Sequence, residues 1–328
     1  MQRIDNYGSM FQALALKQIL SEMGSKVVFV DFIIEPTIFN RNKSSNNLVK
    51  KIKRRISYLF AKEYNKRLHP IFLRFYPLLG LSKHYRFHRK VDVLVIGSDE
   101  VFNCFQKGSN IGYSLELFGK NNHSKKLISY AASFGGSTYN DVLKFGVGNE
   151  LAYYLNRFDG ISVRDNNSMK IVNNLINKEP SMHLDPTLVS GFENLPIWKK
   201  VNLENYVLIY GYQNRFSKEE LEKIEKFADE KCLKIIKLFG DQNIKGELLN
   251  AEVVEVLDVF KKANYIFTDT FHGTIFSVIK HKQVVIFPRC NNGLDFSNNN
   301  KLIDLVNKLG LEKQLYQTSS NLNEVCDN

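Results

Sequence analysis

The chain has 328 residues, of which 44% are hydrophobic, and its formal net charge is +11. This length suffices for two domains, and the composition is that of a globular protein without the ~20-residue apolar run of a membrane span or the apolar segment of a secretory signal. The four cysteines lie far apart without a CxxC pair, which argues against a zinc site or a disulfide framework and favours a reducing, cytoplasmic location with no bound metal.

The positive charge is concentrated between residues 41 and 90. This segment holds fifteen Lys and Arg and one acid, so its net charge is +14 and the rest of the chain carries −3. It also includes an apolar, aromatic stretch at 71–79. Such a basic insertion suits peripheral contact with an anionic membrane or a polyanionic substrate, and a solvated loop is the alternative. No nucleic-acid-binding motif is present, so we expect no nucleic-acid partner.

Hydrophobic periodicity predicts alternating helices and strands in the first half of the chain. The predicted elements are a helix at 8–24, strands at 26–32, 91–97 and 127–133, a helix at 150–156, a strand at 160–164 and a helix at 165–177. The nearly continuous apolar run at 91–97 is typical of a buried parallel strand. Together these elements predict a Rossmann-like N-terminal domain over residues 1–189, with the basic insertion at about 41–90.

After a linker at 190–205, the alternation restarts. The predicted elements are strands at 206–210, 234–238, 265–267 and 283–287, and helices at 217–232, 257–263, from 271 onward, and at 300–309. Ser217 and Glu220 form a capping box at the first of these helices. The fold class is therefore α/β, with a second Rossmann-like domain over 190–328 that faces the first across a cleft. Ligands of such sheets bind beyond the carboxyl ends of the strands.

The first predicted helix lacks the strand that normally precedes it. Only five residues stand before Asn6, which is too few for an inner strand of a sheet. A missing inner strand leaves ladder groups of its neighbours unpaired, which is costly. We therefore expect the natural start to lie upstream of Met1, and loss of this strand is the alternative.

His272 lies where the predicted strand ending at Thr268 gives way to a helix. A helix N-terminus offers N–H groups and a partial positive charge, which attract anions and favour a neutral imidazole that can act as a base. A histidine that caps or packs a turn is an equally weighted reading of this position alone.

Six separated motifs resemble the polysaccharide pyruvyl transferase family, in the same order along residues 6 to 310. They are Asn6-Tyr7-Gly8-Ser9 with Gln12-Ala13, Gly97-Ser98-Asp99-Glu100-Val101-Phe102-Asn103, Ser129 to Gly135, Ser162-Val163-Arg164-Asp165 with Ser168, Leu184-Asp185-Pro186-Thr187, and Asp269-Thr270-Phe271-His272-Gly273. The resemblance implies a glycosyltransferase-B-like pair of domains. It also implies transfer of a pyruvyl group from phosphoenolpyruvate to two hydroxyls of a sugar as a ketal. The expected acceptor is a glycan or lipid-linked oligosaccharide of surface-polysaccharide (exopolysaccharide or capsule) synthesis, and no cofactor is needed besides the donor substrate.

The resemblance also suggests roles for residues. His272 suits a general acid or base, and Arg164 suits the donor's carboxylate and phosphate, with a structural salt bridge as the alternative. The N–H groups of Gly273 and Thr274 could receive the departing phosphate. Asp99 is expected to orient His272 or accept a sugar proton, with helix capping as the alternative. The remaining expected substrate contacts are Asn6, Tyr7, Gly8, Ser98, Asn103, Ser133 and Asp269, for which turn, cap or core roles are the alternatives.

Several positions depart from the family pattern. Thr270 stands where some members have an arginine two positions before the histidine, so Arg215 or Arg289 is expected to supply that cation. Glu100 and Phe102 replace the usual Gln and Trp, and residues 299–301 replace a Ser-Arg pair. Two other functions therefore stay open: a nucleotide-sugar glycosyltransferase of the same architecture, and an inactive glycan-binding relative.

Overall fold

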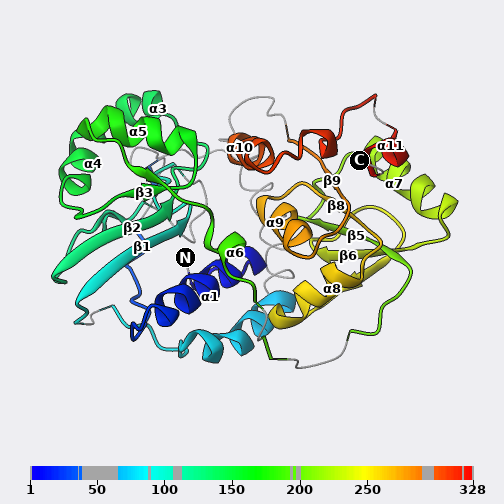
Figure 1. The fold of residues 1–328 in the computed structure, drawn as a ribbon, viewed down its shortest axis with the longest axis horizontal. Coiled ribbons are helices and arrows are strands. Elements are labelled where there is room, and N and C mark those ends of the chain that lie inside the picture. The colour runs from blue at the N-terminus through cyan, green and yellow to red at the C-terminus, as the bar shows by residue number, and fades with distance from the viewer. Residues whose placement is uncertain are drawn as a thin grey trace, which may run out of the picture. The chain divides into compact units, whose positions relative to one another are not determined.

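The computed structural model describes residues 2–35, 37–38, 66–87, 90–105, 113–192, 195–196, 201–289, 299–319 and 321–326. The chain divides into two compact units, Met1–Ser190 and Gly191–Asn328. Each unit contains one parallel sheet with helices packed against it (Figure 1). The predicted α/β class with two Rossmann-like units is therefore confirmed.

The sheet of the first unit has four parallel strands in the order β1-β2-β3-β4. The strands are β1 (Val93–Asp99), β2 (Lys126–Ala132), β3 (Ser162–Val163) and β4 (Ser181–Met182). The helical elements are α1 (Tyr7–Glu22), η2 (Leu115–Phe118), α3 (Tyr139–Lys144), α4 (Gly148–Leu155), α5 (Asn166–Ile176) and α6 (Pro186–Val189). Helices α3, α4 and α5 lie together on one side of this sheet, and α1 lies on the other (Figure 1).

The predicted strand at 26–32 is wrong, because these residues form no strand in the structure. A strand needs a neighbouring ladder, and β1 is an edge strand of the four-stranded sheet within the described residues. The segment is held by side chains instead. The Asp31 carboxylate accepts hydrogen bonds from Arg3 Nε at 2.6 Å and from the Arg86 backbone N–H at 2.7 Å.

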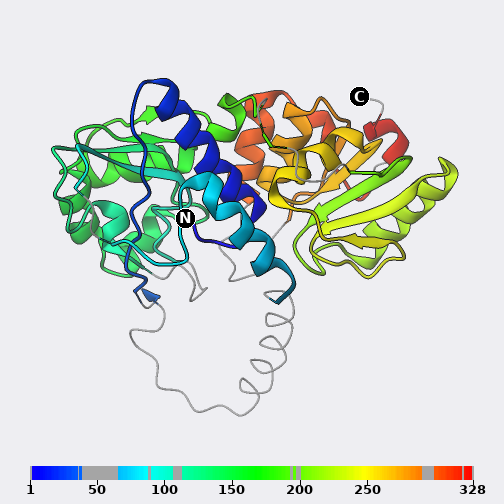
Figure 2. The ribbon, with the colours of Figure 1, turned by 90° about the horizontal axis from the view of Figure 1, so that it is seen from below.

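The described part of the basic insertion includes a helix at 66–79, which lies beside α1 (Figure 2). The ring of Phe72 packs 5.0 Å from that of Tyr7, and Phe75 lies 6.4 Å from Phe11, with all four side chains fully buried. The aromatic stretch predicted to accompany a membrane-binding surface is thus part of the core. The basic residues of the insertion between 39 and 65 lie outside the described residues. No helix within the described ranges is long and apolar enough to cross a bilayer.

The second unit has a five-stranded parallel sheet in the order β7-β6-β5-β8-β9. The strands are β5 (Tyr206–Gly211), β6 (Lys234–Phe239), β7 (Glu247–Leu249), β8 (Tyr265–Thr268) and β9 (Val284–Ile286). The helical elements are α7 (Lys218–Glu230), η3 (Val253–Glu255), α8 (Val256–Lys262), α9 (Phe271–Ile279), α10 (Asn299–Leu309), η4 (Glu312–Gln314) and α11 (Leu322–Cys326).

Successive side chains of β5 are buried on opposite faces of this sheet. Val207 and Ile209 join a core cluster with residues of α7 and α11. Tyr210 instead packs edge-on against Phe260 of α8 and Phe276 of α9. Burial on both faces explains why the sequence of this strand is continuously apolar. The predicted capping box of α7 is present, with Ser217 Oγ accepting from the Glu220 N–H.

Candidate functional site

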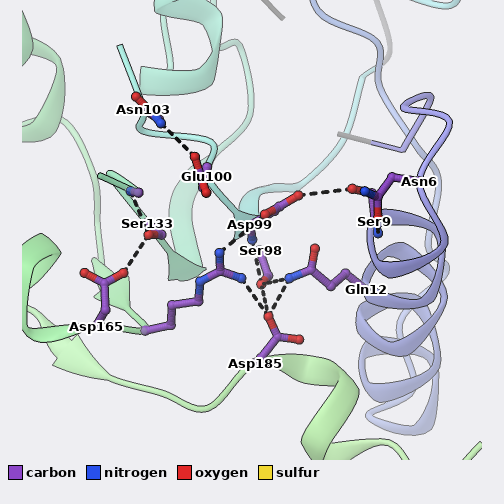
Figure 3. A network of polar contacts seen from close by, with 12 residues as sticks. Asn6, Ser9, Gln12, Ser98, Asp99, Glu100, Asn103, Ser133, Asp165 and Asp185 are labelled. Carbon is purple, nitrogen blue, oxygen red and sulfur yellow. Dashed lines mark hydrogen bonds and ion pairs between the residues drawn. The ribbon is translucent and has the colours of Figure 1, made fainter. Parts of the chain in front are cut away.

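A buried polar network lies at the carboxyl ends of β1 and β3 in the first unit (Figure 3). Arg164 follows β3 and is 5% exposed. Its Nη1 donates to Asp185 Oδ2 at 2.8 Å, and its Nη2 donates to Asp99 Oδ1 at 3.3 Å. Arg164 therefore forms the salt bridges that were the alternative to donor binding, with Asp185 and Asp99 as partners.

Electrostatics keep the Arg164 guanidinium charged. Burial opposes the charge, but the surrounding carboxylates, Asp185 first and then Asp99, outweigh burial and raise the pKa of Arg164. The guanidinium thus remains a fixed cation inside the unit. Its carboxylate partners are held in place by the same contacts.

Asp185 connects three elements of this unit. Its Oδ1 accepts from the N–H of Thr187 at 3.1 Å and so caps α6. Its Oδ2 accepts from the Gln12 amide of α1, from Ser98 Oγ at 3.3 Å, and from Arg164. Asp185 and Gln12 are not among the site residues predicted above, although both lie in motifs that resemble the family. Their contact across 173 positions leaves no trace in local spacing.

Asp99 ends β1 with a φ of 77°, which is uncommon for a residue other than glycine. Its Oδ2 accepts a hydrogen bond from Ser9 Oγ at 3.1 Å, in addition to the contact with Arg164. Asn6 caps α1 by accepting from the Ser9 N–H at 3.3 Å. The structure therefore brings Asn6, Ser98, Asp99 and Arg164 together at one end of the sheet. Backbone strain at a held carboxylate is typical of functional sites.

The other predicted contacts of the first unit use their polar groups internally. Ser133 Oγ donates to Asp165 Oδ2 at 2.6 Å. Asn103 donates from Nδ2 to Glu100 at 2.7 Å, and its Oδ1 accepts from Ser137 Oγ at 2.7 Å. Tyr7 and Gly8 are buried in the first turn of α1. These positions therefore have internal partners or are buried in this structure, and their contact with substrate stays a prediction.

A second charged cluster lies at the carboxyl end of β8 in the second unit. The Asp269 side chain is fully buried. Its Oδ2 forms an ion pair with Arg215, whose Nε lies 3.1 Å away, and accepts a hydrogen bond from Arg289 Nε at 3.2 Å. Burial raises the pKa of Asp269, and the two guanidinium groups only partly offset this effect. Arg289 also donates to both carboxylate oxygens of Glu220, at 2.8 and 2.7 Å, and stacks over Phe216.

The first turn of α9 is capped by its own sequence. Thr270 Oγ1 accepts from the Gly273 N–H at 2.9 Å, and its carbonyl accepts from the Thr274 N–H at 3.1 Å. Thr270 thus occupies both N–H groups that were expected to receive phosphate, and a phosphate contact there stays a prediction. A Cβ at Gly273 would lie 2.1 Å from Thr268 Oγ1, so this glycine is needed for close packing.

His272 lies in this first turn and is partly exposed. Its ring packs 5.3 Å from Phe271 and 6.0 Å from Phe276. The expected position at the strand-to-helix junction is therefore confirmed, and its chemical role stays a prediction. Across the described ranges, no three His, Cys, Asp or Glu side chains are grouped in a way that could hold a metal ion.

Comparison with known proteins gives one extensive match. The family model described as polysaccharide pyruvyl transferase matches residues 6–291. No curated protein sequence matches the chain. Among solved structures, the S. aureus MnaA-UDP co-structure superposes with a TM-score of 0.47 and 10% sequence identity, covering 78% of this chain and 75% of that one.

Proposed function

Because the chain belongs to the polysaccharide pyruvyl transferase family, we propose that it transfers the pyruvyl group of phosphoenolpyruvate to a sugar of a surface-polysaccharide precursor. Family membership over residues 6–291 is the observation that carries this proposal. The charged cluster of the second unit supports it, since a donor with a carboxylate and a phosphate needs cations at defined positions, and Arg215 of this cluster is 39% exposed.

The reaction consumes two sugar hydroxyls and releases one phosphate. One proton adds to the methylene carbon of phosphoenolpyruvate, which becomes the ketal methyl group. The neighbouring carbon then has oxocarbenium character and is attacked by one sugar oxygen, and its bond to the phosphate oxygen breaks. The second sugar oxygen completes the ketal. The hydroxyls thus supply two protons, one to the methyl group and one to the phosphate.

His272 is the proposed general acid or base of this sequence. It lies in the first turn of α9, just beyond the carboxyl end of β8, where ligands of such sheets bind. In the first unit, Asp99 is the proposed acceptor of a sugar proton. Arg164 contacts Asp99 directly, so it acts in this proposal as the group that holds this carboxylate in place.

Phosphate release tests the proposal. The protein is incubated with phosphoenolpyruvate and a panel of lipid-linked and simple glycosides, and inorganic phosphate is measured. We expect acceptor-dependent release by the wild-type protein and a loss of about 100-fold or more in His272→Ala, the scale of a lost acid–base group. His281→Ala, which removes a histidine beyond the end of α9, is the matched control and should retain the rate. Absence of release, together with absence of phosphoenolpyruvate binding by calorimetry, would contradict the proposal.

A further inference from the structure

We propose that Arg215, held by Asp269, binds a phosphoryl group of the ligand in the second unit. This inference rests on the proposed function, because it assigns a phosphate-binding cation to that enzyme. The phosphoryl group could belong to phosphoenolpyruvate or to the diphosphate of a lipid-linked acceptor, and the experiment below separates these sources.

The position of Arg215 follows from the order of the strands. β5 is paired with β6 on one side and with β8 on the other. The chain leaves β5 through α7 to reach β6, and leaves β8 through α9 to reach β9, so the connections diverge from the β5–β8 pair. Loops at such a switch point bind ligands in doubly wound sheets. Arg215 is in the loop after β5, and Asp269 directly follows β8.

The two arginines on Asp269 differ in what they can still bind. The Arg289 side chain is 18% exposed, and its Nη1 already donates to both oxygens of Glu220. Its Nη2 has no hydrogen-bond partner in the described residues but is buried. The Arg215 side chain is 39% exposed and contacts Asp269 only through Nε. Within the described part of the chain, its two Nη groups have no hydrogen-bond partner. A guanidinium fixed through Nε can present both Nη groups to one phosphoryl group.

The N-terminus of α9, next to Asp269, has two of its N–H groups occupied. Thr270 occupies the N–H groups of Gly273 and Thr274, so α9 cannot offer them to an anion without losing its cap. A side-chain cation can supply attraction for an anion that these two N–H groups do not. Lys301 of α10 reaches the same turn, with Nζ 5.6 Å from the Phe271 ring. Both cations lie beside the turn that carries His272.

Asp269 is a positioning residue for Arg215 in this proposal. A Cβ at Gly211 would lie only 2.8 Å from Asp269 Oδ1, so the carboxylate is packed closely against the end of β5. With Oδ1 fixed there, Oδ2 faces both arginine Nε atoms. Arg289 also donates a hydrogen bond to Asp269, and its ion pair with Glu220 links it to α7. The ion pair thus holds Arg215 Nε 3.1 Å from Asp269 Oδ2.

Calorimetry with two probes tests the role of Arg215. We expect Arg215→Gln to weaken binding of phosphoenolpyruvate, of inorganic pyrophosphate, or of both, by about 10- to 100-fold, the scale of a charged hydrogen-bonded contact. Lys218→Gln, which removes an exposed cation from the start of α7, is the control and should change neither. Weakening with phosphoenolpyruvate assigns Arg215 to the donor, and weakening with pyrophosphate alone assigns it to the acceptor carrier.

The outcomes separate this inference from the proposed function. Unchanged binding of both probes in Arg215→Gln would overturn the role of Arg215 while leaving pyruvyl transfer intact. Binding of pyrophosphate through Arg215 without any binding of phosphoenolpyruvate would keep the inference and contradict the donor. Failure of the wild-type protein to bind either probe would overturn both.

A double-mutant cycle tests the positioning role of Asp269. We expect Asp269→Asn to weaken probe binding in the wild-type background and to have no further effect in Arg215→Gln. A merely structural role predicts an equal additional loss in both backgrounds and would overturn the positioning role. Thermal unfolding of each variant identifies any that fails to fold. If Asp269→Asn does not fold, Asp269→Glu, which keeps the charge but displaces it, is the substitute.

Discussion

Asp185 lies in a short Asp-Pro-Thr turn but has polar contacts with several distant parts of the first unit. It accepts hydrogen bonds from α1, from the end of β1, from Arg164 and from Thr187. Removal of one member of a buried ion pair leaves the other charge uncompensated, which is more costly than loss of the pair itself. Asp185 therefore links the stability of this unit to the geometry of Asp99.

We expect Asp185→Asn to lower the free energy of unfolding by about 3 kcal/mol, as measured by urea denaturation, because it leaves the Arg164 charge buried with one carboxylate fewer. Asp92→Asn is the control. Asp92 pairs with Lys125 in full contact with solvent, and such pairs contribute little. An equal loss in both variants would show that the buried network does not stabilise the unit.

Close packing around position 273 also requires a glycine there. A methyl group there would meet Thr268 Oγ1, Thr270 Oγ1 at 2.6 Å and Tyr210 at 2.8 Å. We expect Gly273→Ala to destabilise the protein by about 1–3 kcal/mol, the usual cost of overpacking. Gly148→Ala, where the nearest side-chain atom is 3.6 Å away, should leave the melting temperature unchanged or slightly raised. A melting temperature for Gly273→Ala equal to that of the wild-type protein would contradict this packing.

At the scale of elements, residues 2–5 are held by an ion pair and side-chain hydrogen bonds and not by strand pairing in a sheet. Arg3 pairs with Asp31 and donates to the carbonyls of Ser82 and His84, and so ties residues 2–5 to two distant segments. Burial of Asp31 opposes its ionisation, but hydrogen bonds from Arg3 and the Arg86 N–H outweigh burial and lower its pKa below the ordinary 3.8. The segment leads directly into Asn6 and α1.

This pairing predicts an acid-sensitive attachment. Because the pKa of Asp31 is lower in the folded state, its stabilising contribution is present above pH 3.8 and is lost as the pH falls through the folded-state pKa. Asp31→Asn should therefore unfold more easily than the wild-type protein at neutral pH. The difference should shrink below about pH 3.8, as followed by urea denaturation at several pH values. A difference that stays constant over this range would contradict the assignment.

The secondary structure could be predicted where local sequence decides it. The capping box of α7 and the apolar run of β5 gave correct elements, because caps and continuous burial leave short-range signals. Hydrophobic periodicity predicts a strand at 26–32 that the structure does not contain. Strand formation depends on a partner elsewhere in the chain, and local composition does not encode one.

The sequence predicts which residues belong to the candidate site better than it predicts their contacts. Motif resemblance selected Arg164, Asp99 and His272, and it left Arg215 and Arg289 as equal alternatives. Only the three-dimensional contacts distinguish them, since Glu220 neutralises Arg289 from 69 positions away. Occupation of the Gly273 N–H by Thr270 likewise depends on the geometry of the cap.

At the scale of the whole molecule, both units follow one plan. In each unit, charged side chains collect at the carboxyl ends of parallel strands, and a buried carboxylate holds an arginine there: Asp185 with Arg164, and Asp269 with Arg215. Such charges are costly to bury, and retaining them in both units favours a role beyond stability. Handling of the proposed anionic donor would provide that role.

The fate of the pyruvyl carbons tests the central claim most directly. Phosphoenolpyruvate labelled with carbon-13 at its methylene carbon is incubated with the protein and the glycoside panel, and the products are analysed by NMR spectroscopy. We predict that the label appears in a methyl group of a ketal attached to the sugar, with one phosphate released per ketal, and that His272→Ala forms it at least about 100-fold more slowly. Label found only in phosphoenolpyruvate or in free pyruvate, with every acceptor unmodified, would contradict the account.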